Sequence, residues 1–277
     1  IYEICATTDA QVQIMPLIED IMTGKVEVSD IRKVEVEDLL GRDPVELDIS
    51  RISDSITDST VLVTGAGGSI GSELCRQVAR LGVESLCVVE LSEFNLYRIE
   101  QELRAEFPEL ILNAVLGDCG DPAVVEHALA LVRPHVVFHA AAYKHVPMLQ
   151  EQSREAVRNN VLATQTLALA AIRHQVDTFV LISSDKAVNP TNVMGASKRI
   201  AEMVCQSLAR ESTTRFITVR FGNVLDSAGS VVPLFREQIQ RGGPVTVTHP
   251  EVTRYFMTIP EACQLILQAA VLGDGGE

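Results

Sequence analysis

The stretch VLVTGAGGSIGSEL, residues 61–74, joins a short β-branched run to a glycine-rich loop and then to a helix-like segment. Gly65, Gly68 and Gly71 follow the spacing G-x-x-G-x-x-G. Glycines so placed allow a tight turn, a close approach of the backbone to a ligand, and close packing of a helix on a strand. A helix that begins near Ser69 would point its N–H groups and its dipole at a phosphate. The stretch therefore predicts a dinucleotide-binding turn.

Short apolar runs alternate with helix-period segments from residue 60 onwards. Strands of this buried type, separated by helices, predict an α/β fold with a Rossmann-like, doubly wound parallel sheet. The predicted strands are 61–65, 86–90, 112–118, 135–141, 178–184 and 216–222. The predicted helices between them are 72–81, 95–107, 123–132, 159–174 and 197–211.

Three regions are expected along the chain. We interpret residues 1–57 as the tail of an upstream domain and a linker, with a helix at Val12–Thr23 and a turn at Gly41–Pro44. Residues 58–222 form the expected NAD-binding domain. Residues 223–277 form a small, incomplete substrate-binding lobe that is interleaved with it. Because the chain starts without Met and stops at GDGGE, we expect a fragment of a longer protein.

Composition restricts the class of protein. The 277 residues carry a net charge of −14, which argues against a nucleic-acid partner. The six cysteines are scattered without C-x-x-C spacing, so we expect buried reduced thiols and no metal site. The sequence shows neither a signal peptide nor an apolar run of roughly 18 residues that could span a bilayer.

A carboxylate and several small residues follow the later strands. Glu90 ends the strand 86–90, where a carboxylate accepts hydrogen bonds from an adenosine ribose and would repel a 2′-phosphate, so NAD is favoured over NADP. Asp118 is placed to meet the adenine amine or to form an Asx turn. The candidate cofactor-binding residues are Gly65, Gly68, Ser69, Ile70, Gly71, Glu90, Asp118, Cys119, Ala140, Ala141, Ala142 and Lys198.

Ser184, Met194 and Lys198 form a frame in which one residue is unexpected. Ser184 ends a strand, and Met194 and Lys198 lie one helical turn apart on the next helix. Short-chain dehydrogenases carry a tyrosine four residues before the lysine, and its phenolate moves a proton. Methionine cannot do so. We expect Lys198 to position the cofactor and supply positive charge, and Met194 to pack beside the nicotinamide.

Asp185 and Lys186 directly follow Ser184, at the carboxyl end of a strand, where open α/β sheets bind ligands. A carboxyl and an amine side by side can act as an acid and a base if burial keeps both uncharged. The other interpretation is an ordinary Asp–Lys turn, since charged side chains are mostly solvated.

Four further stretches support the interpretation of Asp185 and Lys186 as an acid and a base. HAAAYKHVP, SSDKAVNPTNVMGASKR, RFGNVLDSAGSVVPLF and VTRYFMTIPEA follow TGAGGSIGSEL in this order. Together they resemble the sugar-nucleotide 4,6-dehydratases of the CapD-like polysaccharide-biosynthesis family, which are extended short-chain dehydrogenase/reductases. The resemblance covers about residues 35–277. It is greatest to the long, membrane-anchored members, which carry methionine at the position of Met194 and act on UDP-N-acetylglucosamine.

The resemblance implies a reaction. NAD would take a hydride from C4 of the sugar and return it to C6, with a net loss of water and with retention at C5. Lys186 would take the C5 proton, Asp185 would protonate the leaving C6 hydroxyl, and Ser184 would bind the C4 oxygen. Water, Ser184 or Asp185 could accept the C4 hydroxyl proton.

The resemblance also implies substrate contacts and a setting. Asn223 and Arg254 match positions that hold the phosphates of the UDP-sugar, and Lys144, His145 and Ser230 are candidates to face it. A homodimer through the helices of NNVLATQ and SKRIAEM is expected. The reaction would occur at the cytoplasmic face, with the longer parent anchored in the inner membrane. The alternatives are a C4 epimerase or reductase, and a catalytically dead module that senses NAD or nucleotide sugars.

Overall fold

The computed structural model describes residues 13–14, 32–33, 48–247 and 249–277. The chain divides into two units, Ile1–Asp43 and Pro44–Glu277. In the first unit β1 (Gln13–Ile14) pairs antiparallel with β2 (Arg32–Lys33). The predicted helix at 12–23 is therefore wrong at Gln13 and Ile14. The rest of that helix, and the whole of the predicted turn at 41–44, lie outside the described residues.

The second unit begins before residue 57. Its helix α3 (Ile49–Ile56) is capped by the Asp48 side chain, which accepts a hydrogen bond from the backbone N–H of Arg51. Ile52 and Ile56 are buried and belong to the hydrophobic core. The predicted linker boundary at residue 57 thus falls too late, because the apolar face of this helix packs on the main fold.

Six parallel strands form the central sheet, in the order β5-β4-β3-β6-β7-β8. This order confirms the predicted doubly wound sheet, in which the chain moves outwards in both directions from β3. The strands are β3 (Thr60–Thr64), β4 (Ser85–Glu90), β5 (Ile111–Leu116), β6 (Val136–His139), β7 (Thr178–Ser184) and β8 (Arg215–Phe221).

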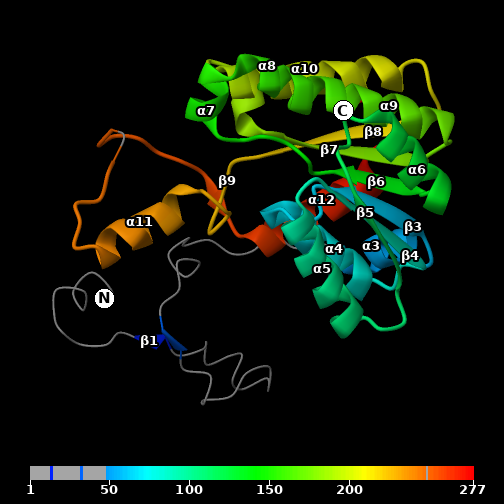
Figure 1. Cartoon of the computed structure of the whole chain (residues 1–277), viewed down its shortest axis with the longest axis horizontal. Helices are drawn as coiled ribbons and strands as arrows, with labels where there is room; N and C mark the ends of the chain where they lie inside the picture. The colour runs from blue at the N-terminus through cyan, green and yellow to red at the C-terminus, as the bar shows by residue number, and fades with distance from the viewer. Residues whose placement is uncertain (1–12, 15–31, 34–47, 248) are drawn as a thin grey trace. The chain divides into compact units, whose positions relative to one another are not determined.

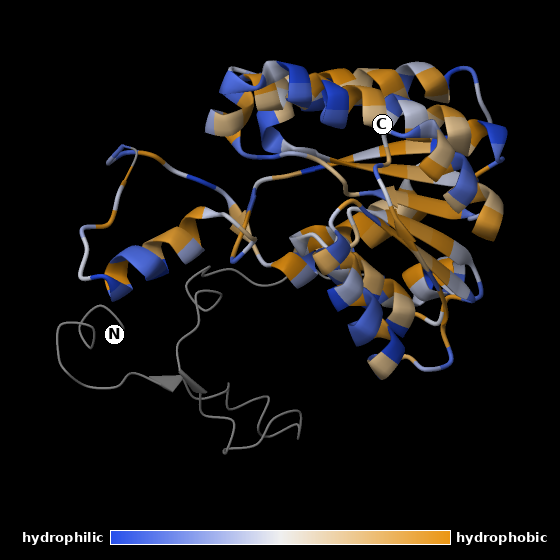
Figure 2. Ribbon diagram, in the orientation of Figure 1, coloured by the Kyte–Doolittle hydropathy of each residue, from blue (hydrophilic) through white to orange (hydrophobic). Residues whose placement is uncertain are grey.

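Helices cover both faces of the sheet (Figure 1). One core cluster joins the sheet to α3, α4 (Ser69–Arg80), α5 (Glu93–Glu106) and α12 (Ile259–Leu272). The other joins it to α6 (Pro122–Val132), α9 (Ala163–Arg173) and α10 (Val193–Ala209). The sheet between them is largely apolar (Figure 2), as expected for strands that are covered on both faces.

Short elements complete the fold and surround the carboxyl ends of β6 to β8. After β6 come α7 (Val146–Glu151), α8 (Ser153–Ala156) and a π-helical turn (Val157–Leu162). A 3₁₀ turn (Asp185–Ala187) follows β7. After β8, β9 (Asn223–Val224) pairs in parallel with β10 (Phe256–Met257), and α11 (Val231–Gln240) lies between them in sequence.

All five predicted helices start earlier than expected. The helix predicted at 159–174 begins at Val157, in the π-helical turn, and continues as α9. The helix predicted at 197–211 begins at Val193, because the Asn192 side chain caps it by accepting a hydrogen bond from the N–H of Gly195. Met194 and Lys198 consequently lie in its first two turns.

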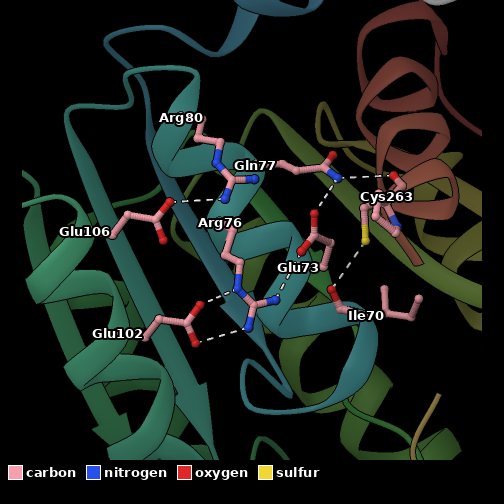
Figure 3. Close-up of polar contacts among 9 residues, drawn as sticks. Ile70, Glu73, Arg76, Gln77, Arg80, Glu102, Glu106 and Cys263 are labelled. Atoms are coloured by element: carbon pink, nitrogen blue, oxygen red, sulfur yellow. Dashed lines mark hydrogen bonds and ion pairs between the residues drawn. The ribbon is translucent and has the colours of Figure 1, made fainter. Parts of the chain in front are cut away.

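Helix α4, which follows the glycine loop, is fixed on both sides (Figure 3). Arg76 makes a bidentate contact with Glu102 of α5. On the other side, the Cys263 thiol of α12 donates to the carbonyl oxygen of Ile70. The last helix of the chain therefore packs beside the first helix of the dinucleotide fold.

The five described cysteines, Cys75, Cys87, Cys119, Cys205 and Cys263, are buried free thiols, as expected; Cys5 lies outside the described residues. Among the helices that the structure describes, none combines the length and the apolar content needed to cross a bilayer.

Candidate functional site

The glycine loop approaches the end of β6 very closely. Gly65 has φ +63°, and a Cβ built on it would lie 2.7 Å from the Cα and N atoms of Ala141. A Cβ on Gly71 would lie 2.1 Å from the carbonyl oxygen of Gly65. Since no side chain fits at either position, these two glycines are required by the backbone path itself.

Glu90 is joined to the same loop. Its Oε2 atom accepts a 2.9 Å hydrogen bond from the N–H of Gly67, and its Oε1 atom accepts one of 3.0 Å from the N–H of Ser92. The carboxylate is almost completely buried. Each oxygen retains a lone pair, so Glu90 can also accept from ribose hydroxyls. The contact with Gly67 was missed in the sequence, where Gly67 is only the first glycine of a pair.

Two adjoining cavities lie at the carboxyl ends of the strands. The larger has a volume of about 580 Å³ and the smaller about 190 Å³. Both are lined by Gly65, Gly68, Ala140 and Ala142, so the glycine loop forms their common wall. Every candidate cofactor-binding residue lines one or both, with Glu90, Asp118 and Cys119 at the smaller cavity and Lys198 at the larger.

This arrangement fits a dinucleotide. A helix N-terminus and backbone N–H groups of the glycine loop lie at the common wall, where a pyrophosphate needs donors. A buried carboxylate lies at the smaller cavity, as a ribose requires. The larger cavity, which Lys198 lines, leaves room for a further part of the dinucleotide.

The predicted catalytic residues gather at the larger cavity, with one exception. Ser184, Lys186, Met194 and Lys198 line it. Asp185 is not among the lining residues, and it contacts the cavity wall through its neighbours. Its Oδ1 atom accepts hydrogen bonds from Ser184 Oγ at 2.9 Å and from Lys186 Nζ at 3.0 Å.

The charge state of Asp185 differs from the expectation. Burial opposes ionisation of this carboxyl, but the hydrogen bonds from Lys186 and Ser184 outweigh burial and leave the pKa of Asp185 below its ordinary value. The side chains of Asp185 and Lys186 are 45% and 34% exposed. The condition that burial keeps this carboxyl uncharged is therefore not met in the free protein, because the hydrogen bonds from Lys186 and Ser184 stabilise its ionised form.

Lys198 lies deeper than Lys186. It is 6% exposed, and its Nζ atom donates a 2.7 Å hydrogen bond to the carbonyl oxygen of Ile182 on β7. Burial lowers the pKa of Lys198 to about 8. Met194, one turn earlier, is buried against Leu149 and Ala156. The methionine thus fills the position of the phenol with apolar contacts.

The candidate substrate residues divide into two groups. Lys144, His145, Asn223 and Ser230 line the larger cavity. Arg254 does not: it is exposed, and its guanidinium donates to the carbonyl oxygen of Thr253. The position of Arg254 in the motif VTRYF can be read from the sequence. Where its side chain lies depends on the path of the long connection before β10.

The larger cavity suits an anion. Its described ionisable residues are Tyr143, Lys144, His145, Lys186 and Lys198, and none of the described lining residues is an aspartate or a glutamate. Burial lowers the pKa of Lys144. The chain as a whole carries a net charge of −14, so the basic side chains gathered at this cavity would attract a negatively charged ligand there.

Sequence reasoning missed two buried polar residues that brace this cavity. Asn160 holds Tyr143: its Oδ1 atom accepts from the backbone N–H and its Nδ2 atom donates to the carbonyl oxygen. Glu202, fully buried, accepts from Ser183 Oγ at 2.6 Å and from Arg220 Nε at 2.8 Å. Their spacing in the sequence is that of ordinary helix residues, so no local signal distinguishes them.

Known proteins share this sequence family and this fold. The sequence matches the family described as "Polysaccharide biosynthesis protein" over residues 61–277. The capsular polysaccharide biosynthesis protein CapD of Staphylococcus aureus is 53% identical over 279 residues, which cover 100% of this chain and 47% of that protein. The chain thus spans about half the length of this relative. An uncharacterized membrane protein, MJ1061 of Methanocaldococcus jannaschii, is 44% identical over 82% of this chain and 67% of its own length.

Solved structures give the same result. The X-ray structure of Pen from Bacillus thuringiensis has a TM-score of 0.75 and 34% identity, and the match covers 79% of this chain and 69% of Pen. Structures at 19% to 22% identity that hold NAD share the fold, and relatives at 32% to 34% are described as UDP-glucose 4-epimerases. The chain belongs to the polysaccharide biosynthesis protein family, within the extended short-chain dehydrogenase/reductases.

Proposed function

We propose that this chain carries the active site of an NAD-dependent UDP-N-acetylglucosamine 4,6-dehydratase that retains configuration at C5. The observation that carries the proposal is the hydrogen-bonded run Ser184–Asp185–Lys186, whose first and third members line the cationic cavity. NAD, bound along the glycine loop, would accept a hydride from C4 and give it back at C6.

The first proton moves through Ser184. Because Ser184 Oγ donates to Asp185 Oδ1, it can take the C4 hydroxyl proton while passing its own proton to the carboxylate. An ionised Asp185 is what this relay requires, in agreement with its lowered pKa. The C4 oxygen becomes a ketone, which acidifies the C5 proton.

Lys186 and Asp185 then remove water. Lys186, as a neutral amine, takes the C5 proton, and the protonated Asp185 gives its proton to the C6 hydroxyl, which leaves as water. Lys186 finally returns a proton to C5, so both side chains regain their starting states. Lys186 can act as this base only while its amine is neutral, because an ammonium has no lone pair to accept a proton.

The test is turnover of UDP-N-acetylglucosamine by the NAD-loaded protein, followed by mass spectrometry. The expected product is lighter than the substrate by one water and carries deuterium at C5 when it is formed in D₂O. Lys186→Ala and Asp185→Asn should each lower kcat by about 100-fold or more, and the exposed control Arg241→Ala should not.

Other outcomes identify the alternatives. A product of unchanged mass with inverted C4 would indicate an epimerase, which needs a group that shuttles the C4 proton where this chain has Met194. Tight binding of NAD and UDP-sugar without any product from the wild type would indicate a sensing module and overturn the proposal.

The setting of the reaction is part of the proposal. We place it at the cytoplasmic face of a membrane-anchored parent, in keeping with the name of the relative MJ1061. A homodimer through the π-helical turn and α10 is supported by exposed apolar side chains there, Leu162, Ile200 and Met203. Sedimentation of the wild type and of Met203→Asp tests this: a monomer in both would contradict it.

A further inference from the structure

Lys186 has a second contact that comes from another part of the chain. Its Nζ atom donates to Asp185 Oδ1 at 3.0 Å and to Asn223 Oδ1 at 3.3 Å. Asn223 lies 37 residues later, and the same cavity is lined by both Lys186 and Asn223. Family resemblance assigns Asn223 to the phosphates of the substrate, so this contact with the base is a separate role.

The contact follows from strand register. Ser184 and Phe221 are partners in the parallel pairing of β7 with β8. Lys186 and Asn223 are each two residues beyond these strand ends, so the two chains leave the sheet side by side. Asn223 is then fixed by β10, because its backbone N–H donates to the carbonyl oxygen of Tyr255 at 2.9 Å.

We infer that Asn223 is a positioning residue that directs the reactive lone pair of Lys186 into the cavity. The amine nitrogen is tetrahedral, with one bond to carbon and three other positions. Two of these point to the oxygens of Asp185 and Asn223, and they remain N–H donors when the ammonium loses a proton. The third position then holds the lone pair, and it is the one left for the cavity that Lys186 lines.

A neutral amide suits this task better than a second carboxylate. Asn223 offers an oxygen at the right place without adding a negative charge, so it stabilises the ammonium less than a carboxylate would. Its Nδ2 group remains a donor that can meet a phosphate oxygen. The inference rests on the proposed role of Lys186 as the base that takes the C5 proton.

Two substitutions separate the roles of Asn223. Asn223→Leu keeps a similar volume and removes the acceptor, and Asn223→Asp keeps the acceptor and adds a charge. Asn113→Leu, on the edge strand β5, is the matched control. The probe is UDP-N-acetylglucosamine with the NAD-loaded protein, and the readouts are kcat, KM and the isotope effect of deuterium at C5.

For Asn223→Leu we expect kcat to fall by about 10- to 100-fold, with KM changed by less than about threefold. The C5 isotope effect should increase, because proton abstraction becomes the slow step. For Asn223→Asp the acidic limb of the pH–kcat profile should move up by about one pH unit, since a carboxylate stabilises the ammonium. The other ionisable groups near Lys186 are unchanged in every variant, so they cannot cause a shift between the variants. They are Asp185 and, at the cavity wall, Tyr143, Lys144, His145 and Lys198.

A higher KM with unchanged kcat and isotope effect would overturn the inference and leave Asn223 as a phosphate ligand. A second readout is independent of turnover: labelling of the Lys186 amine by acetic anhydride across a range of pH, quantified by mass spectrometry. Asn223→Asp should move this labelling curve to higher pH. Identical curves for all variants would overturn the inference even if the wild type makes no dehydrated product, a result that would separately contradict the proposed function.

Discussion

The Nζ atom of Lys198 donates a 2.7 Å hydrogen bond to the carbonyl oxygen of Ile182, two residues before the end of the strand that carries Ser184. This bond ties α10 to β7. It places a buried amine beside the serine at the larger cavity. With methionine at position 194 in place of a tyrosine, the ammonium of Lys198 has only backbone and distant charges to compensate its burial, which explains its lowered pKa.

Lys198→Met should change the pH dependence of stability. Burial lowers the pKa of Lys198 to about 8 from the ordinary 10.5, so between these values the unfolded chain binds the proton that the folded chain has released. Wild-type stability should therefore increase with pH across this window, by about 3 kcal/mol relative to the variant. Urea denaturation of the NAD-free proteins at pH 7.5 and 10.5 measures the difference, with other groups cancelling between the two proteins. Parallel curves would contradict the burial of a charged amine.

Gly65→Ala should weaken NAD binding by at least about tenfold and destabilise the fold by about 1–3 kcal/mol. Its Cβ would lie 2.7 Å from Ala141, and the backbone has φ +63°. Gly82→Ala is the matched control, because Gly82 has φ +76° with open space around its Cβ. Calorimetric titration with NAD should find the control unchanged in affinity. Equal loss in both variants would show that backbone strain, and not the clash with Ala141, controls the loop.

Glu202→Gln should destabilise the protein by about 3 kcal/mol at neutral pH, because it leaves the Arg220 and Arg199 contacts of a buried carboxylate incomplete. Burial opposes ionisation of Glu202, but hydrogen bonds from Arg220 and Ser183 outweigh it and lower its pKa from the ordinary 4.5. Its stabilising effect is therefore present above pH 4.5 and should disappear as the pH falls below that value. Glu237→Gln, in an exposed pair with Arg241, should cost less than about 1 kcal/mol in the same denaturation series.

Met194→Leu tests whether the methionine only packs. Met194 is buried against Leu149 and Ala156, and leucine has a similar volume. We expect a cost below about 1.5 kcal/mol and a kcat within about threefold of the wild type. A tenfold decrease in kcat with an unchanged melting temperature would assign the thioether a direct part in the chemistry.

The sequence by itself determined the elements and the cofactor turn. The strands from β3 to β8 and the loop at Gly65–Gly71 were predicted because each is encoded by neighbouring residues, as an apolar run or as glycines at a fixed spacing. The position of Ser184 and Lys186 at a ligand cavity followed for the same reason, since the carboxyl end of a parallel strand is a known place in such sheets.

The tertiary structure alone decided the contacts and charges within the site. Lys186 meets Asn223 because of the register between β7 and β8. Arg254 is exposed and does not line the cavity, because its position depends on the path of the chain before β10. The pKa of Asp185 is lowered and not raised because its carboxyl keeps the hydrogen bonds of Lys186 and Ser184 while it remains partly solvated. Hydrogen bonding and desolvation depend on groups and on burial that the whole fold provides, so a local pattern of residues does not contain them.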